Sequence, residues 1–203
     1  MKEPFQSLCE RAYNGMKKDE IVFSDLPPDF NTLGLLHSVE SFATLGKKVS
    51  HYFLHKSIQE LLTAYYIANY TSSERMQVSI INKLFDDHRF STVLQYYAAI
   101  TELKIPGIKD SLTTVAKKFG GVKNHSDEDK HLLLSLLHCL HEAQKSSLCE
   151  SIAHYLQHGV NFSNIRLTPL DCLCISFFLS HICLLYTSPS PRDATLSRMP
   201  SSA

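Results

Sequence analysis

The segment "FLHKSIQELLTAYYIANY", residues 53–70, constrains the fold most, because an apolar helical pattern follows a polar start. Its apolar side chains recur at the spacing of one helix face and predict a buried stripe of Ile58, Leu61, Leu62, Tyr65 and Tyr66. Ser57 and Glu60 have the spacing of a capping box, which predicts Ser57 as the helix cap and places His55 at the strand-to-helix turn before it. A helix with such a stripe must pack against other elements.

The residues before this helix supply those elements. Residues 5–18 have the apolar spacing of a helix, and "EIVF", residues 20–23, predicts a short strand. Residues 33–39 and 49–54 are β-like runs that predict a hairpin. Helix, strand, hairpin and helix in this order are typical of a small winged-helix module, which we place at residues 1–70.

Helical patterns alone follow residue 70. They cover residues 76–85, 90–103, 108–119 and 148–158, and Ser126 with Asp129 forms a capping-box pair ahead of a further apolar run. We interpret residues 71–158 as a helical domain.

Residues 159–182 combine a short extended piece with an apolar helix. Thr168 is a favourable N-cap, and Pro169 suits the first helical position. One helix face is defined by Leu170, Leu173, Cys174, Phe177 and Phe178. A single unit of this kind cannot bury its own face, so we interpret it as the first unit of a solenoid and expect further units beyond it. The predicted fold class is mainly α.

The last 21 residues, Cys183 to Ala203, are abruptly rich in Ser and Pro. Back-translated, residues 183–193 resemble the transposase adapter of short-read sequencing libraries, and "SRMPSSA" resembles its downstream constant part, with an index between them. We therefore expect residues 183–203 to be an adapter-derived, disordered artefact and the native sequence to end near Ile182. The alternative is a disordered Ser/Pro tail that belongs to the protein.

Composition narrows the classes of function. Lys and Arg total 20, as do Asp and Glu, so no basic surplus indicates nucleic acid. No stretch approaches the roughly 20 apolar residues that span a bilayer, so we expect no membrane partner. The cysteines before Cys183 are odd in number and lie in helical, apolar surroundings, which favours reduced thiols and a cytoplasmic protein.

Motifs for catalysis and metal binding are weak. The chain contains no nucleophile motif and no G-x-x-x-x-G-K-[ST] loop, so we expect it not to be an enzyme and to hold no cofactor of its own. His154 and His158, at i and i+4, can face one metal, but the His and Cys residues have no recognised ligand spacing. We predict no metal site.

His55 is the one candidate site residue, and two interpretations are open. Near the positive end of a helix, a neutral imidazole N–H can join the helix amides in binding a phosphate oxygen. Alternatively, His55 is structural and satisfies a local carbonyl within the packed module.

Several segments resemble one family. "LCERAYNGMKKDEIVFSDLP", "LGLLHS" and "YFLHKSIQELLTAYYIA" resemble the winged-helix segment of NOD-like receptors, the NACHT-containing signalling NTPases. "RFSTVLQYYAAITEL" and "LLLSLLHCLHEAQKSSLCESIA" are similar to the helical domain that follows it, and "VNFSNIRLTPLDCLCISFFLS" to the run into the leucine-rich repeats. Ile58 and Leu61 replace two aromatic residues of the family pattern.

The resemblance implies a regulatory arm of a cytoplasmic innate-immunity receptor. The arm would couple the ADP or ATP state of an upstream NACHT domain to a leucine-rich-repeat sensor, both in cis, and the intact receptor would self-oligomerise. His55 matches the winged-helix histidine that contacts the β-phosphate of bound ADP. The P-loop and the Mg-binding acids would lie upstream of Met1, which would then be an internal methionine.

Two other classes of function are open. A winged-helix nucleic-acid binder would use Lys47 and Lys48 at the wing tip with Lys17 and Lys18 at a helix end. A plain helical adaptor would have no link to nucleotide and no special role for His55.

Overall fold

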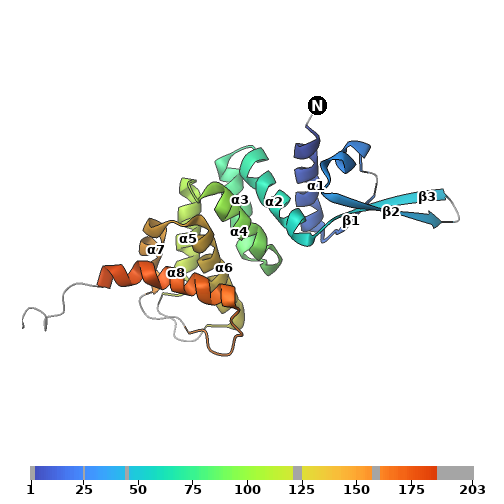
Figure 1. Ribbon diagram of the computed structural model, residues 1–203. Helices are drawn as coiled ribbons and strands as arrows, with labels where there is room; N and C mark the ends of the chain where they lie inside the picture. Colours follow the sequence, from blue (N-terminus) through green and yellow to red (C-terminus); the bar gives the residue numbers. More distant parts are fainter. Residues whose placement is uncertain (1–2, 25, 44–45, 121–124, 157–160, 187–203) are drawn as a thin grey trace, which may run out of the picture. The chain divides into compact units, whose positions relative to one another are not determined.

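The computed structural model describes residues 3–24, 26–43, 46–120, 125–156 and 161–186 (Figure 1). Its described residues form eight α-helices and one three-stranded antiparallel sheet, so the prediction of a mainly α fold is confirmed. The chain divides into two compact units, residues 1–112 and 113–203. The domain boundaries expected near residues 70 and 158 stay predictions.

The first unit begins with the predicted order of elements. Helix α1 (Pro4–Lys18) is followed by β1 (Val22–Ser24), a 3-10 turn (Pro28–Leu33), β2 (Leu36–Ala43), β3 (Gly46–Phe53) and α2 (Lys56–Tyr70). Strand β3 lies between β1 and β2 and is antiparallel to both. The β2–β3 hairpin projects away from α1 and α2 (Figure 1). Its first strand starts later than predicted because the 3-10 turn and Gly34, with φ of 66°, occupy the preceding residues.

A small core joins these elements. Leu8 and Ala12 of α1 are fully buried together with Phe23 of β1, and the rings of Phe23 and Phe53 meet edge to face at 5.6 Å. A Cβ atom added at Gly15 would lie 2.7 Å from the Phe23 ring. Glycine at this position therefore allows α1 to approach β1 closely.

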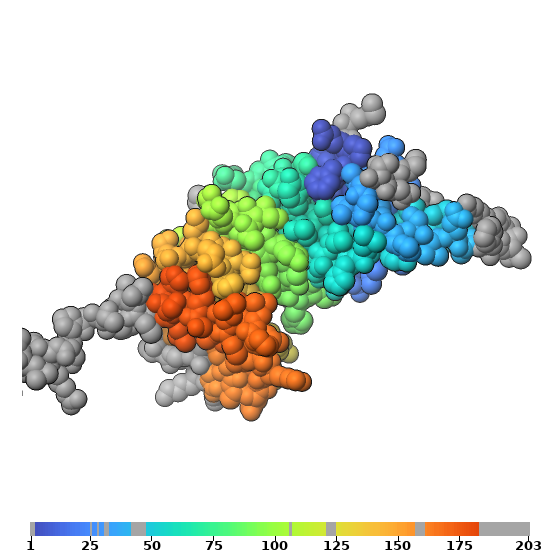
Figure 2. All heavy atoms as spheres, in the orientation of Figure 1, coloured from blue at the N-terminus to red at the C-terminus, as the bar shows by residue number. Residues whose placement is uncertain are grey.

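The predicted buried stripe of α2 is wrong at Leu61. Leu61 is 42% exposed, whereas Leu62 is only 4% exposed, and Ile58, Tyr65 and Tyr66 are half-buried against the core. Figure 2 shows part of α2, in cyan, at the molecular surface. The reason is that α2 packs against two helices, α1 and α4 (Ser91–Thr101), and its buried arc includes Thr63 and Ile67. Leu61 lies on the part of the α2 surface that these two helices do not cover.

Further helical elements complete the first unit. Helix α3 (Glu74–Phe85) and a 3-10 turn (His88–Phe90) lead into α4, and α5 (Pro106–Lys117) begins in the first unit and continues past its boundary at Leu112. Tyr97 of α4 donates a hydrogen bond to Gln77 of α3 at 3.0 Å, and the Gln77 amide donates to the Ala68 carbonyl of α2 at 3.2 Å. This buried chain of polar contacts fixes the three helices to one another.

The second unit contains α6 (Asp127–Ala143), α7 (Ser146–Ala153), a 3-10 turn (His154–Leu156) and α8 (Pro169–Tyr186). Both hydrogen bonds of the predicted capping box between Ser126 and Asp129 are present. Helix α8 packs against α6 and α7. It runs to Tyr186, beyond the expected end of native sequence at Ile182, and residues 187–203 of the expected artefact lie outside the described residues.

The predicted face of α8 is only partly buried. Cys174 and Phe178 are buried, but Leu170 and Leu173 are 44% and 54% exposed. The buried stripe is instead centred on Asp171, Cys174 and Phe178, because a polar contact of Asp171 with α6 sets the rotation of the helix. Within the part of the chain that the structure describes, no helix is long and apolar enough to cross a membrane.

Candidate functional site

His55 caps the start of α2. Its backbone is extended, with φ of −148° and ψ of 147°, and its Nδ1 accepts a hydrogen bond from the backbone N–H of Ser57 at 3.1 Å. The Ser57 hydroxyl lies 2.7 Å from the same nitrogen. His55 is therefore the N-cap, one of the positions at which a side chain satisfies an otherwise unpaired helix amide.

The predicted capping box at Ser57 and Glu60 is accordingly wrong. Ser57 is the second residue of the helix, since α2 begins at Lys56. Glu60 is buried, and its carboxylate lies 3.8 Å from the Lys56 ammonium in place of reaching back to the cap. Because the His55 imidazole accepts from the Ser57 amide, the helix starts at Lys56, two residues earlier than a cap at Ser57 would place it.

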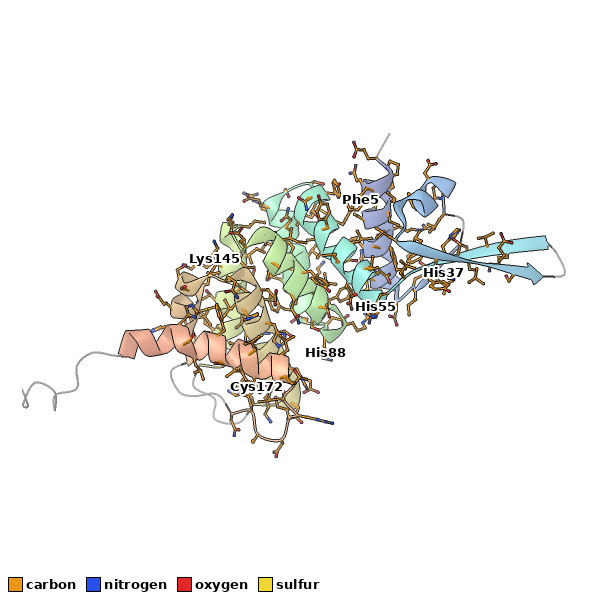
Figure 3. The ribbon with its side chains drawn as sticks, in the orientation of Figure 1. Phe5, His37, His55, His88, Lys145 and Cys172 are labelled. Atoms are coloured by element: carbon orange, nitrogen blue, oxygen red, sulfur yellow. The ribbon has the colours of Figure 1, made fainter. Side chains whose placement is uncertain are left out.

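The cap contact determines which ring nitrogen of His55 can donate. Because Nδ1 accepts from a backbone amide, the neutral imidazole carries its proton on Nε2. Within the described residues Nε2 forms no hydrogen bond, and the side chain is exposed at the end of α2 nearest the sheet (Figure 3). An exposed N–H donor thus lies beside the positive end of the helix dipole, where an anion is favoured.

A small hollow lies beside the first turn of α2. Its lining includes Lys56, Gln59 and Arg89, together with Asp19 and Glu20, and its volume is about 30 Å³. This volume has room for one or two waters, far below the roughly 300 to 1,000 Å³ of small-molecule pockets. This hollow is therefore too small to enclose a nucleotide.

The charges around this hollow are largely paired within the protein. The Arg89 guanidinium donates to the Asp87 carboxylate at 2.7 Å and lies 3.9 Å from that of Asp19. Its hydrogen bonds hold the pKa of the Asp87 carboxyl below its usual range. Lys56 and Arg89 still place two cations close to the His55 end of α2.

A second histidine, on α6, contacts the start of α8, and this contact was not predicted from the sequence. His138 of α6 is buried, and its Nε2 lies 2.8 Å from Oδ1 of Asp171. The other oxygen of Asp171 accepts from the backbone N–H and the hydroxyl of Thr168, at 2.7 and 2.6 Å. The spacing of Thr168 and Asp171 is a capping-box signal, but no local pattern indicates the partner on α6.

These hydrogen bonds keep Asp171 ionised. Burial alone would raise the pKa of its carboxyl, yet the contacts from Thr168 and His138 outweigh burial and lower it from the ordinary value of 3.8. Lys130 makes a related contact earlier on α6, where its buried ammonium donates to Asp127 at 2.8 Å and to the Ser163 carbonyl at 2.7 Å. The contact of Lys130 with Ser163 and the contact of His138 with Asp171 attach the segment that leads into α8 to α6.

The histidines and cysteines considered for metal binding are dispersed. His154 is exposed and contacts the ring of Tyr155, while His158 lies outside the described residues. In the described ranges no group of three or more His, Cys, Asp or Glu side chains is close enough to hold a metal ion. Burial raises the pKa of the Cys139 thiol to about 12, which keeps it protonated and unreactive at neutral pH.

The chain was also compared with known proteins. No protein-family model matches it, and no curated protein matches it. The structural observation that bears on function is therefore the geometry at His55.

Proposed function

We propose that this chain is the regulatory arm of a NOD-like receptor, in which His55 contacts a phosphate of ADP held by an upstream NACHT domain. The first unit would be the winged-helix module, and α8 would open the leucine-rich repeats. The observation that carries the proposal is the state of His55, whose Nδ1 is used by the helix cap so that Nε2–H is left as an exposed donor.

The same geometry explains why the arm needs a second body to bind nucleotide. A net contribution of about 1 kcal/mol is typical of one hydrogen bond, and this corresponds to no measurable affinity alone. The hollow of about 30 Å³ beside α2 adds no enclosure for a base or a ribose. Contacts must therefore come from both sides, with most of them supplied by the nucleotide-binding domain.

Nucleotide state would act through a difference in affinity. ADP that touches His55 only when the arm is closed onto the nucleotide-binding domain stabilises that closed state over the open one. Exchange of ADP for ATP would reduce the stability of the closed state relative to the open state. The arm would then open, which is the reverse of domain closure around a ligand.

The parental gene supplies the first test. Genomic sequence across both ends is expected to encode a P-loop upstream of residue 1 and leucine-rich repeats that continue from Ile182. A locus without an upstream P-loop would overturn the proposal. A locus that reads from Ile182 directly into "CLLYTSPSPRD" would show that the C-terminal segment is native.

Binding to the chain itself supplies the second test. In a titration followed by NMR, ADP is expected to cause no saturable change at His55 below millimolar concentration. Retention on double-stranded DNA that falls steeply with added salt would favour the winged-helix nucleic-acid binder instead. Tight binding of ADP to this chain alone would also contradict the proposed division of contacts.

A further inference from the structure

Strand β2 has one edge that is open to a further strand. The order β1-β3-β2 places β3 on one side of β2, and no strand of the described residues pairs with the other side. Figure 1 shows that the hairpin extends beyond α1 and α2. Natural edge strands are often protected by proline, lysine or a β-bulge. Strand β2 contains neither residue, and its pairing with β3 runs without a bulge from Leu36 to Ala43.

The backbone of β2 has the alternation that a further strand requires. The N–H of Leu54 donates to the carbonyl of Leu35 at 3.2 Å, so these residues form a hydrogen-bonded pair of the antiparallel ladder. Because such pairs alternate, the odd-numbered residues of β2 direct their backbone groups to β3, and the even-numbered ones direct theirs to the open edge. Toward a strand added there, Val39 would occupy a non-hydrogen-bonded position, where opposite side chains approach most closely.

A second copy of the chain fits this edge in one antiparallel register. A two-fold axis at Val39 places the two Val39 side chains opposite each other and His37 opposite Ser41. Val39 is β-branched and 43% exposed, and this pairing would cover it. Moving the axis one residue toward the hairpin tip places Glu40 opposite Glu40, where like charges repel. Moving it one residue the other way places the apolar Leu36 opposite Glu40.

We infer that two copies of this chain associate through their β2 strands, which join the two sheets into one. Backbone hydrogen bonds between the strands supply the affinity, and the side chains opposite each other fix the register. One pair of strands covers less area than the roughly 1,200 Å² of stable interfaces, so the dimer should be weak and form at high protein concentration. The association uses neither His55 nor nucleotide and is independent of the proposed function.

Sedimentation equilibrium of the full chain, at protein concentrations up to about 1 mM, measures this association. The unsubstituted chain is expected to show a reversible equilibrium between monomer and dimer. Val39→Lys and Val39→Glu should each weaken dimerisation about fivefold, because both copies then carry the same charge at the axis. In an equimolar mixture the opposite charges meet, so the two variants should dimerise with each other about fivefold more tightly than either does with itself.

Val22→Lys is the matched control. Val22 of β1 is 53% exposed on the same face of the sheet as Val39, so the substitution puts the same charge at the other edge. It should leave the dimer unchanged, and both exposed sites should tolerate lysine. The inference is overturned if the unsubstituted chain stays monomeric, if Val22→Lys weakens the dimer as much as Val39→Lys, or if the mixture dimerises no better than its components. The second of these results would identify stacking of sheet faces instead.

Discussion

The starts of α2 and α8 use histidine in opposite ways. At α2 the exposed His55 is itself the cap and leaves one ring nitrogen directed to no described residue. At α8 the buried His138 braces Asp171, the carboxylate that completes the cap of Thr168. A histidine whose contacts all lie within the fold is structural, whereas one with an exposed and unused donor at a helix start is suited to a ligand.

The comparison predicts its largest effect at α8. Asp171→Ala leaves the buried His138 donor unpaired, which costs about 1 to 3 kcal/mol, and also removes hydrogen bonds to a charged group worth about 1.5 to 3 kcal/mol. Chemical denaturation should therefore show a loss of roughly 3 kcal/mol or more in the second unit. The matched substitution Glu150→Ala, at an exposed site on α7, should change stability by less than about 0.5 kcal/mol. Similar losses of stability in Asp171→Ala and Glu150→Ala would show that the contact between His138 and Asp171 contributes little.

Acid should remove part of the same stabilisation. The pKa of the Asp171 carboxyl is lowered in the folded chain by Thr168 and His138, which outweigh its burial. Its contribution is therefore fully present above the unfolded value of about 3.8 and is lost as pH falls from there through the lower folded value. The stability difference between the unsubstituted chain and Asp171→Asn should narrow over this window. A difference that stays constant to pH 2 would contradict the ionised brace.

The structure predicts a smaller effect at α2. His55→Leu removes the acceptor of the Ser57 amide, and loss of an N-cap typically costs about 0.5 to 2 kcal/mol. The melting temperature of the first unit should fall accordingly. The His55→Leu variant loses both the helix cap and the Nε2 donor. It therefore cannot distinguish a structural role of His55 from a role in binding a ligand. An unchanged melting temperature would show that the cap is not formed in solution.

The smallest effect on stability is expected for His55→Ser. Serine is among the preferred N-cap residues, so it should restore the contact to the helix amides and keep stability within a few tenths of a kcal/mol. Its short side chain cannot reproduce the Nε2 donor. Thermal unfolding of His55→Ser beside His55→Leu would measure the cap alone, and equal losses would show that the imidazole contributes through packing.

Sequence patterns predicted most elements because their signals are local. The order from α1 to α2, the Ser126 capping box and the start of α8 after Thr168 all depend on residues a few positions apart. The errors arise where distant packing decides. Leu61 is exposed because α1 and α4 occupy the other faces of α2, a fact that helical spacing alone does not contain.

The candidate sites also differ in whether they depend on local sequence signals or on contacts between distant residues. His55 was found because a polar residue before an apolar helix is a local feature, although its role as the cap was assigned to Ser57. The contact between His138 and Asp171 spans 33 residues, so no spacing rule identifies it. The open edge of β2 likewise follows from the order of the strands, which only the three-dimensional structure reveals.

The most direct test of the central claim measures release of ADP from a protein that contains this chain and its upstream NACHT domain. If Nε2 of His55 donates to a phosphate, His55→Ser removes a hydrogen bond to a charged group worth about 1.5 to 3 kcal/mol, which is about a ten- to hundredfold loss of ADP retention. His88→Ser, at an exposed histidine of the same unit, should leave retention unchanged. Equal retention in both variants, with normal folding, would show that His55 is only a helix cap.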